Sequence, residues 1–223
     1  TSVGGTATFA GDVDVTTLAI GNTVANVAIN GNGSTITNDI DFANDGTLQL
    51  GDATGDTLTF NGGLDTSDVG GTVTLNGTIA TSNDGIIFDA VTLGSATTID
   101  TNASSSGADI TFNGAITGGS NNLTLSTGDN VSGTDVLSKA AISGLGNLTL
   151  ADVGGTATFN ANISAAAFSA DNTVANINLK GASNTFSAAS TLANDGTLTF
   201  GDATGDSFTF NGGLTTSDVG GTV

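Results

Sequence analysis

Two short acidic segments hold the side chains in this sequence that are best suited to chemistry. The run Gly-Asp-Ala-Thr-Gly-Asp at residues 51–56 recurs unchanged at residues 201–206, and one further Asp precedes each run by a few residues. Carboxylate oxygens on a glycine-rich turn are ligands that Ca²⁺ prefers. The spacing differs from the tandem Gly-Gly-x-Gly-x-Asp repeat of calcium-binding β-rolls. The same carboxylates could instead accept hydrogen bonds from turn amides, which is the interpretation we favour. The calcium candidates are Asp45, Asp52, Asp56, Asp195, Asp202 and Asp206.

Most catalytic chemistry is excluded by the residue types present. The chain uses twelve residue types and contains no His, Cys, Tyr, Glu or Arg. Imidazole bases, thiolate nucleophiles and Ser-His-Asp triads therefore have no residues from which to form. A pair of Asp side chains could in principle serve a glycosidase-type mechanism. We predict that the protein is not an enzyme and requires no cofactor, with Ca²⁺ as a candidate ligand.

The charge balance restricts the partners. All 21 acidic residues are Asp, and against Lys139 and Lys180 they give a net charge of −19. Nucleic acids and anionic membrane surfaces attract basic proteins and would repel this chain. Its apolar runs are only a few residues long, too short for insertion across a bilayer. Uniform negative charge favours solubility and opposes edge-to-edge pairing of β-rich proteins.

Alternating triplets predict the elements that must position these side chains. An apolar, a small polar and a second apolar residue follow one another many times, which is the period of a strand with one buried face. No stripe of helical spacing persists, and Thr, Gly, Asn and Asp disfavour helix. The clearest triplets begin at Val27, Leu48, Leu58, Val73, Val91, Ile110, Leu123, Leu148, Leu198 and Phe208. The inward ladders are expected to include Phe60, Phe112, Phe200, Phe208 and Phe210.

Tight corners separate the triplets. Pairs such as Asn30-Gly31, Asp45-Gly46 and Asn61-Gly62 supply the positive φ that such corners need. The chain has 34 Gly and no Pro, so every strand residue keeps its amide donor for a ladder bonded on both sides. A hairpin sandwich and a β-solenoid both accommodate short strands with frequent turns.

The interval at which triplets return favours the solenoid. A sandwich usually has longer strands and large aromatic core residues, whereas these strands are about three to five residues long. Equivalent triplets return after 21 residues from Val27 to Leu48, after 18 from Val73 to Val91 and after 19 from Val91 to Ile110. One turn of a three-faced solenoid needs about this length. We predict an all-β parallel β-helix with about 20 residues per coil, so that the 223 residues form roughly 11 coils.

The chain also repeats itself at a spacing of 150 residues. Residues 1–73 align without a gap to residues 151–223 and match at 40 of 73 positions. We predict one continuous β-solenoid over 1–223, with a full repeat unit at 1–150 and a partial second unit at 151–223. Such an array is expected to be a segment of a much longer repetitive protein. A shorter motif, Val-Gly-Gly-Thr, begins at Val3, Val69, Val153 and Val219.

Several phrases resemble a known family. Residues 107–127 read GADITFNGAITGGSNNLTLST, Gly-Asn-Leu-Thr-Leu follows at 146–150, and Val-Thr-Leu-Gly lies upstream at 91–94. With the Val-Gly-Gly-Thr at Val153, they are similar to the repeats of filamentous-haemagglutinin-like bacterial exoproteins and autotransporter passengers. The resemblance implies a right-handed parallel β-helix, export to the cell surface, and a role as an adhesin shaft or extracellular fibre. The secretion domain and receptor-binding segments of that family have no match here, so no functional residue is carried over.

Three functions stay open at this point. The first is a structural segment of a long extracellular or cell-surface fibre, whose partners are further copies of the same repeat, in one chain or end to end, with lateral self-association. The second is an adhesin module that binds host or bacterial glycans or proteins. The third is ice binding, because outward Thr pairs such as Thr57/Thr59 occur, although far apart in the sequence. Residues 131–144, where the triplet pattern weakens, could form a protruding loop or a lateral contact, and we expect the loop.

Overall fold

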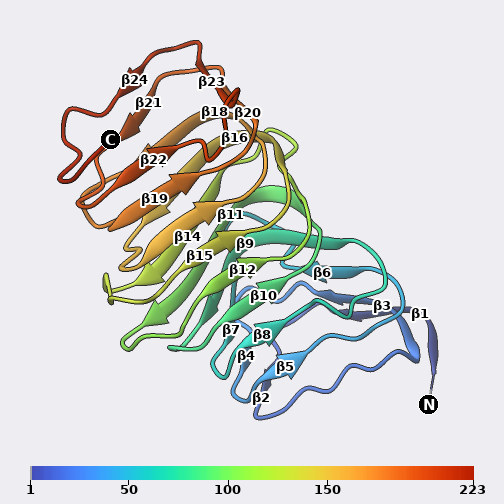
Figure 1. Cartoon of the computed structure of the whole chain (residues 1–223). Coiled ribbons are helices and arrows are strands. Elements are labelled where there is room, and N and C mark those ends of the chain that lie inside the picture. Colours follow the sequence, from blue (N-terminus) through green and yellow to red (C-terminus); the bar gives the residue numbers. More distant parts are fainter. Residues whose placement is uncertain (1) are drawn as a thin grey trace.

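The chain winds into a stack of short parallel strands. The computed structural model describes residues 2–223, which form 24 strands and no helix. The coils follow one another from the N-terminal end (blue in Figure 1) to the C-terminal end (red). A strand with a coil on both sides pairs in parallel with strands of the coil before and the coil after, as β6 does with β3 and β9. This part of the chain therefore contains no helix that could cross a membrane.

Three ladders of strands form three faces, which the chain visits in turn within each coil. We call them face 1, face 2 and face 3. Four long strands, β9, β11, β16 and β18, run across the corner from face 1 to face 2 and contribute to both.

Face 1 consists of β1 (Val3–Phe9), β3 (Val24–Ile29), β6 (Leu48–Leu50), β9 (Val73–Thr81), β11 (Val91–Ala103), β13 (Ile116–Thr117), β16 (Ile142–Ala151), β18 (Ile163–Ala170), β20 (Ser183–Phe186) and β23 (Ser207–Phe210). Face 2 adds to the four long strands β2 (Asp14–Val15), β4 (Thr35–Ile36), β7 (Thr57–Phe60), β14 (Leu123–Gly128), β21 (Ser190–Leu192) and β24 (Leu214–Thr215). Face 3 consists of β5 (Ile40–Asp41), β8 (Leu64–Asp65), β10 (Ile86–Phe88), β12 (Ile110–Phe112), β15 (Val136–Ser138), β17 (Thr156–Phe159), β19 (Asn176–Leu179) and β22 (Leu198–Phe200).

The predicted all-β parallel β-helix is confirmed. Along face 1, Val27 pairs with Leu48, Leu48 with Val73 and Val73 with Val91, so each of these steps is one coil. The described residues make about ten turns, since ten strands stack on face 1, instead of roughly 11, because several coils are longer than predicted. The prediction that Val91 and Ile110 lie one coil apart was wrong. Val91 pairs with Ile116, whereas Ile110 lies on face 3.

The interior consists of stacked apolar ladders. Phe60 and Phe112 are fully buried, as predicted, and the Phe112 ring stacks on Phe88 at a centroid distance of 5.3 Å. Phe208 and Phe210 pack against the same core but stay partly exposed, because they belong to the last coil described. Full burial of one such side chain contributes about 1.5–3 kcal/mol. Stability therefore comes from contacts between neighbouring coils.

The Val-Gly-Gly-Thr motif marks corners where two coils touch backbone to backbone. A Cβ built on Gly70 would lie 2.3 Å from the carbonyl oxygen of Asp45 in the preceding coil, and one on Gly220 would lie 2.2 Å from that of Asp195. Only glycine fits such a contact. Gly4 belongs to the same motif in the first coil, and a Cβ there would meet no atom within 4 Å. The glycine requirement at these corners therefore arises from stacking.

A buried Asn supports the same corner in both copies of the repeat. The Asn44 side chain is fully buried, and its Nδ2 donates to the carbonyl oxygen of Thr47 at 3.0 Å. Asn194, at the equivalent position of the second copy, donates in the same way to Thr197 at 2.9 Å. Because buried carbonyl groups need partners, these amides stabilise the turn that leads into the next strand.

The two copies of the repeat lie on different faces. Along face 1, six successive strand pairings connect β3 to β18, so β18 lies six coils after β3. The strand that corresponds to β3 in the second copy is β19, which follows β18 on face 3, two faces further along the coil. The 150-residue unit therefore spans six coils and two faces, about six and two-thirds turns. The local pairing is nevertheless the same, since Val27 pairs with Leu48 on face 1 and Ile177 pairs with Leu198 on face 3.

Residues 131–144 do not form a protruding loop, so that expectation was wrong. Within them, β15 pairs with β12 and β17 on face 3, and β16 begins at Ile142. Val136 and Ile142 are buried in the core. The strand was missed because Ser138, which is also buried, takes the place of the second apolar residue of the triplet.

Candidate functional sites

The two Gly-Asp-Ala-Thr-Gly-Asp runs form the same loop in both copies, after β6 in the first and after β22 in the second. Asp56 Oδ2 accepts hydrogen bonds from the amides of Asp52 and Ala53 at 2.7 and 2.9 Å. Asp206 Oδ2 accepts the equivalent bonds at 2.9 and 3.0 Å. One carboxylate oxygen in each loop therefore satisfies turn amides, which is the structural role favoured from the sequence.

Asp45 and Asp195 lie away from these loops. Each precedes the strand that the loop follows, so the strand separates it from the loop. Their own amides bond to the preceding coil, Asp45 to the carbonyl oxygen of Val24 at 3.0 Å and Asp195 to that of Val174 at 2.8 Å. Within residues 2–223, no group of three or more acidic side chains is arranged to hold a metal ion. Calcium binding stays a prediction for the loops.

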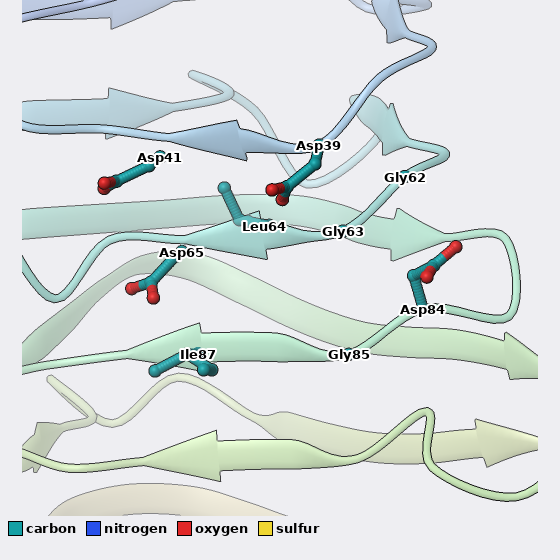
Figure 2. A pocket seen from close by; sticks show the side chains of 9 residues that line it. All are labelled: Asp39, Asp41, Gly62, Gly63, Leu64, Asp65, Asp84, Gly85 and Ile87. Atoms are coloured by element: carbon teal, nitrogen blue, oxygen red, sulfur yellow. The ribbon is translucent and has the colours of Figure 1, made fainter.

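A groove on face 3 is a further acidic feature, one that the repeat pattern did not point to. It has a volume of about 470 Å³ and runs over the outward side of β5, β8 and β10 (Figure 2). Asp41 and Asp65 are register partners on β5 and β8, and Figure 2 shows them one above the other. Asp39 and Asp84 lie toward the other end of the groove, at the corners that lead into β5 and β10. Four carboxylates thus line one concave surface.

Asp41 is the groove carboxylate whose ionisation is disfavoured. Partial burial raises the pKa of Asp41, and the neighbouring carboxylates of Asp65, Asp68 and Asp39 raise it further. Like charges directly opposite each other on paired strands are destabilising. Asp65 offsets part of this cost by accepting a hydrogen bond from the amide of Ser67 at 2.8 Å.

The groove does not recur with the repeat. The positions in the second copy that correspond to Asp39, Asp41 and Asp65 hold Ala189, Thr191 and Thr215. A sequence signal existed in the spacing of Asp41 and Asp65, which is about one coil. Only the register of face 3 shows that the two residues are neighbours.

Outward hydroxyl groups form continuous files on two faces of the described stack. Register pairs place Thr or Ser at one outward position in seven successive coils of face 1 and in eight of face 2. The face 1 file is Thr74, Thr92, Thr117, Ser143, Ser164, Thr185 and Thr209, in which Ser143 and Ser164 follow the paired Ile142 and Ile163. The face 2 file is Thr57, Thr78, Thr98, Thr124, Thr149, Ser169, Thr191 and Thr215.

The Thr pairs noted in the sequence do not extend into a double file. Thr59, the second member of its pair, is followed in the next two coils by Ala80 and Asp100. The single files could not be found by spacing, because the coils that separate their members differ in length by several residues. Register across coils, and not sequence interval, brings these hydroxyls together.

These observations define the chain as a β-solenoid of stacked parallel coils. Comparisons with known proteins identify no relative. No family model matches the chain, and neither a curated protein nor a solved structure is similar to it at a significant level.

Proposed function

We propose that this chain is a structural segment of a long extracellular or cell-surface bacterial fibre, as a filament or adhesin shaft of the filamentous-haemagglutinin-like or autotransporter type. The observation that carries the proposal is that one sequence unit builds the same coils on two different faces of a single stack. A unit of this kind extends the stack without requiring any other part of the molecule. Repetition of the unit lengthens the stack, as expected of a shaft.

Matching side-chain contacts in the two copies support this modularity. Asn26 Oδ1 accepts the amide of Thr47 at 2.9 Å, and Asn176 Oδ1 accepts the amide of Thr197 at 2.9 Å. Because each coil contacts only its neighbours, added units contribute stability locally. The partners of the segment are therefore further copies of the repeat, in the same chain or end to end.

An adhesin module with a repeated binding face has less support. The acidic groove is a concave surface with four carboxylates, yet the second copy has Ala189, Thr191 and Thr215 where the first has Asp39, Asp41 and Asp65. A ligand held by the groove would be bound once and not once per repeat. The net charge of −19 instead suits a long β-rich object that must stay dispersed.

Electron microscopy with gold-labelled antibody against this chain tests the proposal on the cells that produce it. We expect label along thin unbranched fibres at the cell surface. At ~4.8 Å per coil, one unit of six and two-thirds coils advances ~32 Å, and three units return to the same face after ~96 Å. Label confined to the cell interior, or to isolated globular particles, would contradict a fibre.

A further inference from the structure

Face 1 differs from the other two faces in its charge. The parts of its ten strands that form the face contain no Asp or Lys anywhere in residues 2–223. Face 2 carries Asp14 and Asp100 within its strands, and face 3 carries Asp41 and Asp65. On a chain with a net charge of −19, face 1 is therefore a long neutral strip.

The corners sharpen this asymmetry. The described corners between face 1 and face 2 hold Asp12, Asp52 and Asp56 before β9, and no charged residue from β9 onward. The corners between face 3 and face 1 hold five Asp together with both lysines, which offset part of the negative charge there. Lys139 Nζ donates there to Asn113 Oδ1 at 2.7 Å. The corners between face 2 and face 3 hold Asp39, Asp84, Asp109, Asp129, Asp135, Asp152, Asp171 and Asp195 and no lysine. In a three-faced stack this acidic edge is the one opposite face 1.

Face 1 also presents an ordered set of exposed groups. Its hydroxyl file repeats once per coil, and the members from Thr117 to Thr209 are exposed to solvent. A second copy of the chain has the same file with the same rise of ~4.8 Å per coil. Two such files can therefore stay in register over many coils, with each coil adding small methyl contacts and hydroxyl hydrogen bonds.

We propose that face 1 is a lateral docking surface for face 1 of a second copy of this chain. Facing neutral strips bring the two stacks together while the acidic edges point outward, farther apart than the screening length of ~8 Å at physiological salt. The same acidic edges repel a third copy, so association ends at a pair. The charge thus limits lateral growth as well as maintaining solubility. This pairing does not depend on the proposed fibre, because ten strands of face 1 lie within the described residues of this chain.

Sedimentation equilibrium of the isolated chain tests the pairing. We expect the mass to rise from 21.5 kDa toward twice that value with concentration at physiological salt, where the acidic edges of the pair are screened from each other. Thr117→Asp places a charge in the face 1 file and is expected to weaken association at least tenfold. Thr185→Asp is a second variant on the same face. Thr199→Asp is the matched control, since Thr199 is an exposed, outward strand residue on face 3, and it should leave association unchanged.

Three results would overturn the proposal. One is a mass of 21.5 kDa at all protein concentrations and salt conditions. Another is equal weakening by the face 1 variants and the Thr199 variant. The third is a monomer that binds a neutral polysaccharide matrix or retards ice growth, with either activity lost in Thr117→Asp. Circular dichroism of each variant establishes that the coils are intact. None of these results bears on whether the chain belongs to a fibre, which the labelling experiment decides separately.

Discussion

Residues 24–60 and residues 174–210 follow the same pattern of strands and corners but occupy different parts of the stack. The first segment begins on face 1 in the interior, and the second begins on face 3 and runs into the last coil described. Their pairings agree residue by residue, while their burial does not, since Phe60 is fully buried and Phe210 is partly exposed. Local pairing is therefore a property of the sequence unit. The contribution of each residue to the free energy of unfolding depends on whether a coil lies on both sides of it.

The largest expected effect separates a stacked glycine from an unstacked one. Gly70→Val places side-chain atoms against the Asp45 carbonyl, and we expect a loss of about 3 kcal/mol or more from overpacking against backbone that cannot move aside. Gly4→Val, in the same motif without a coil beneath it, should change stability by less than about 0.5 kcal/mol. Urea unfolding followed by circular dichroism measures both. Similar losses in the two variants would mean that the motif itself, and not stacking, requires glycine.

The next effect compares equivalent core residues in the two copies. Phe60→Ala removes a fully buried ring and should cost about 3–5 kcal/mol. Phe210→Ala, at the same position of the repeat, removes a partly exposed ring and should cost about half as much or less. The same urea titration measures this difference. Equal costs would show that Phe210 is covered in solution by a further coil or a second molecule.

The smallest effect concerns the carboxylates that only the first copy carries. Because folding raises the pKa of Asp41, the folded chain holds that proton more tightly than the unfolded chain. The resulting stability is present at low pH and is lost as the pH rises through the raised pKa. Asp41→Asn removes this loss, so we expect its melting temperature at pH 7 to exceed that of the wild type by about 1–2 °C.

The pH dependence of this variant provides its control. The difference should disappear below about pH 3, where both chains are uncharged at the site. Thr191→Asn alters the equivalent position in the second copy, which has no carboxylate, and should show no pH-dependent difference. A stabilisation of Asp41→Asn that persists at low pH would point to packing instead of charge.

The fold class could be predicted from the sequence because it depends on local chemistry. Inward triplets such as Leu48-Gln49-Leu50 have the predicted role. Gly46 lies at a corner as predicted, but it does not adopt the positive φ expected of it; glycine is needed there because a Cβ would lie 2.5 Å from the carbonyl oxygen of Ala25 in the preceding coil. The amide-capping role of Asp56 was also within reach, because the Asp lies only three and four residues from the amides that it accepts.

The arrangement around the axis could not be predicted in the same way. Coil length varies between register partners, from the short coil that separates Val73 and Val91 to the longer one that separates Ile116 and Ile142. One coil of irregular length therefore shifts every later strand away from the position that a fixed interval predicts. Ile110 was placed on the wrong face for this reason. The acidic groove and the hydroxyl files both require that register, and a buried Ser138 concealed a strand.

The fractional number of turns in the repeat has a consequence for length variation. Inserting or deleting one whole unit in an array of this kind would keep every strand paired, since the same pairings form on either face. It would also rotate everything beyond the change by about a third of a revolution. The number of units would then set the orientation, around the solenoid axis, of any domain that follows the array. Recombination between copies could therefore rotate such a domain without changing its sequence.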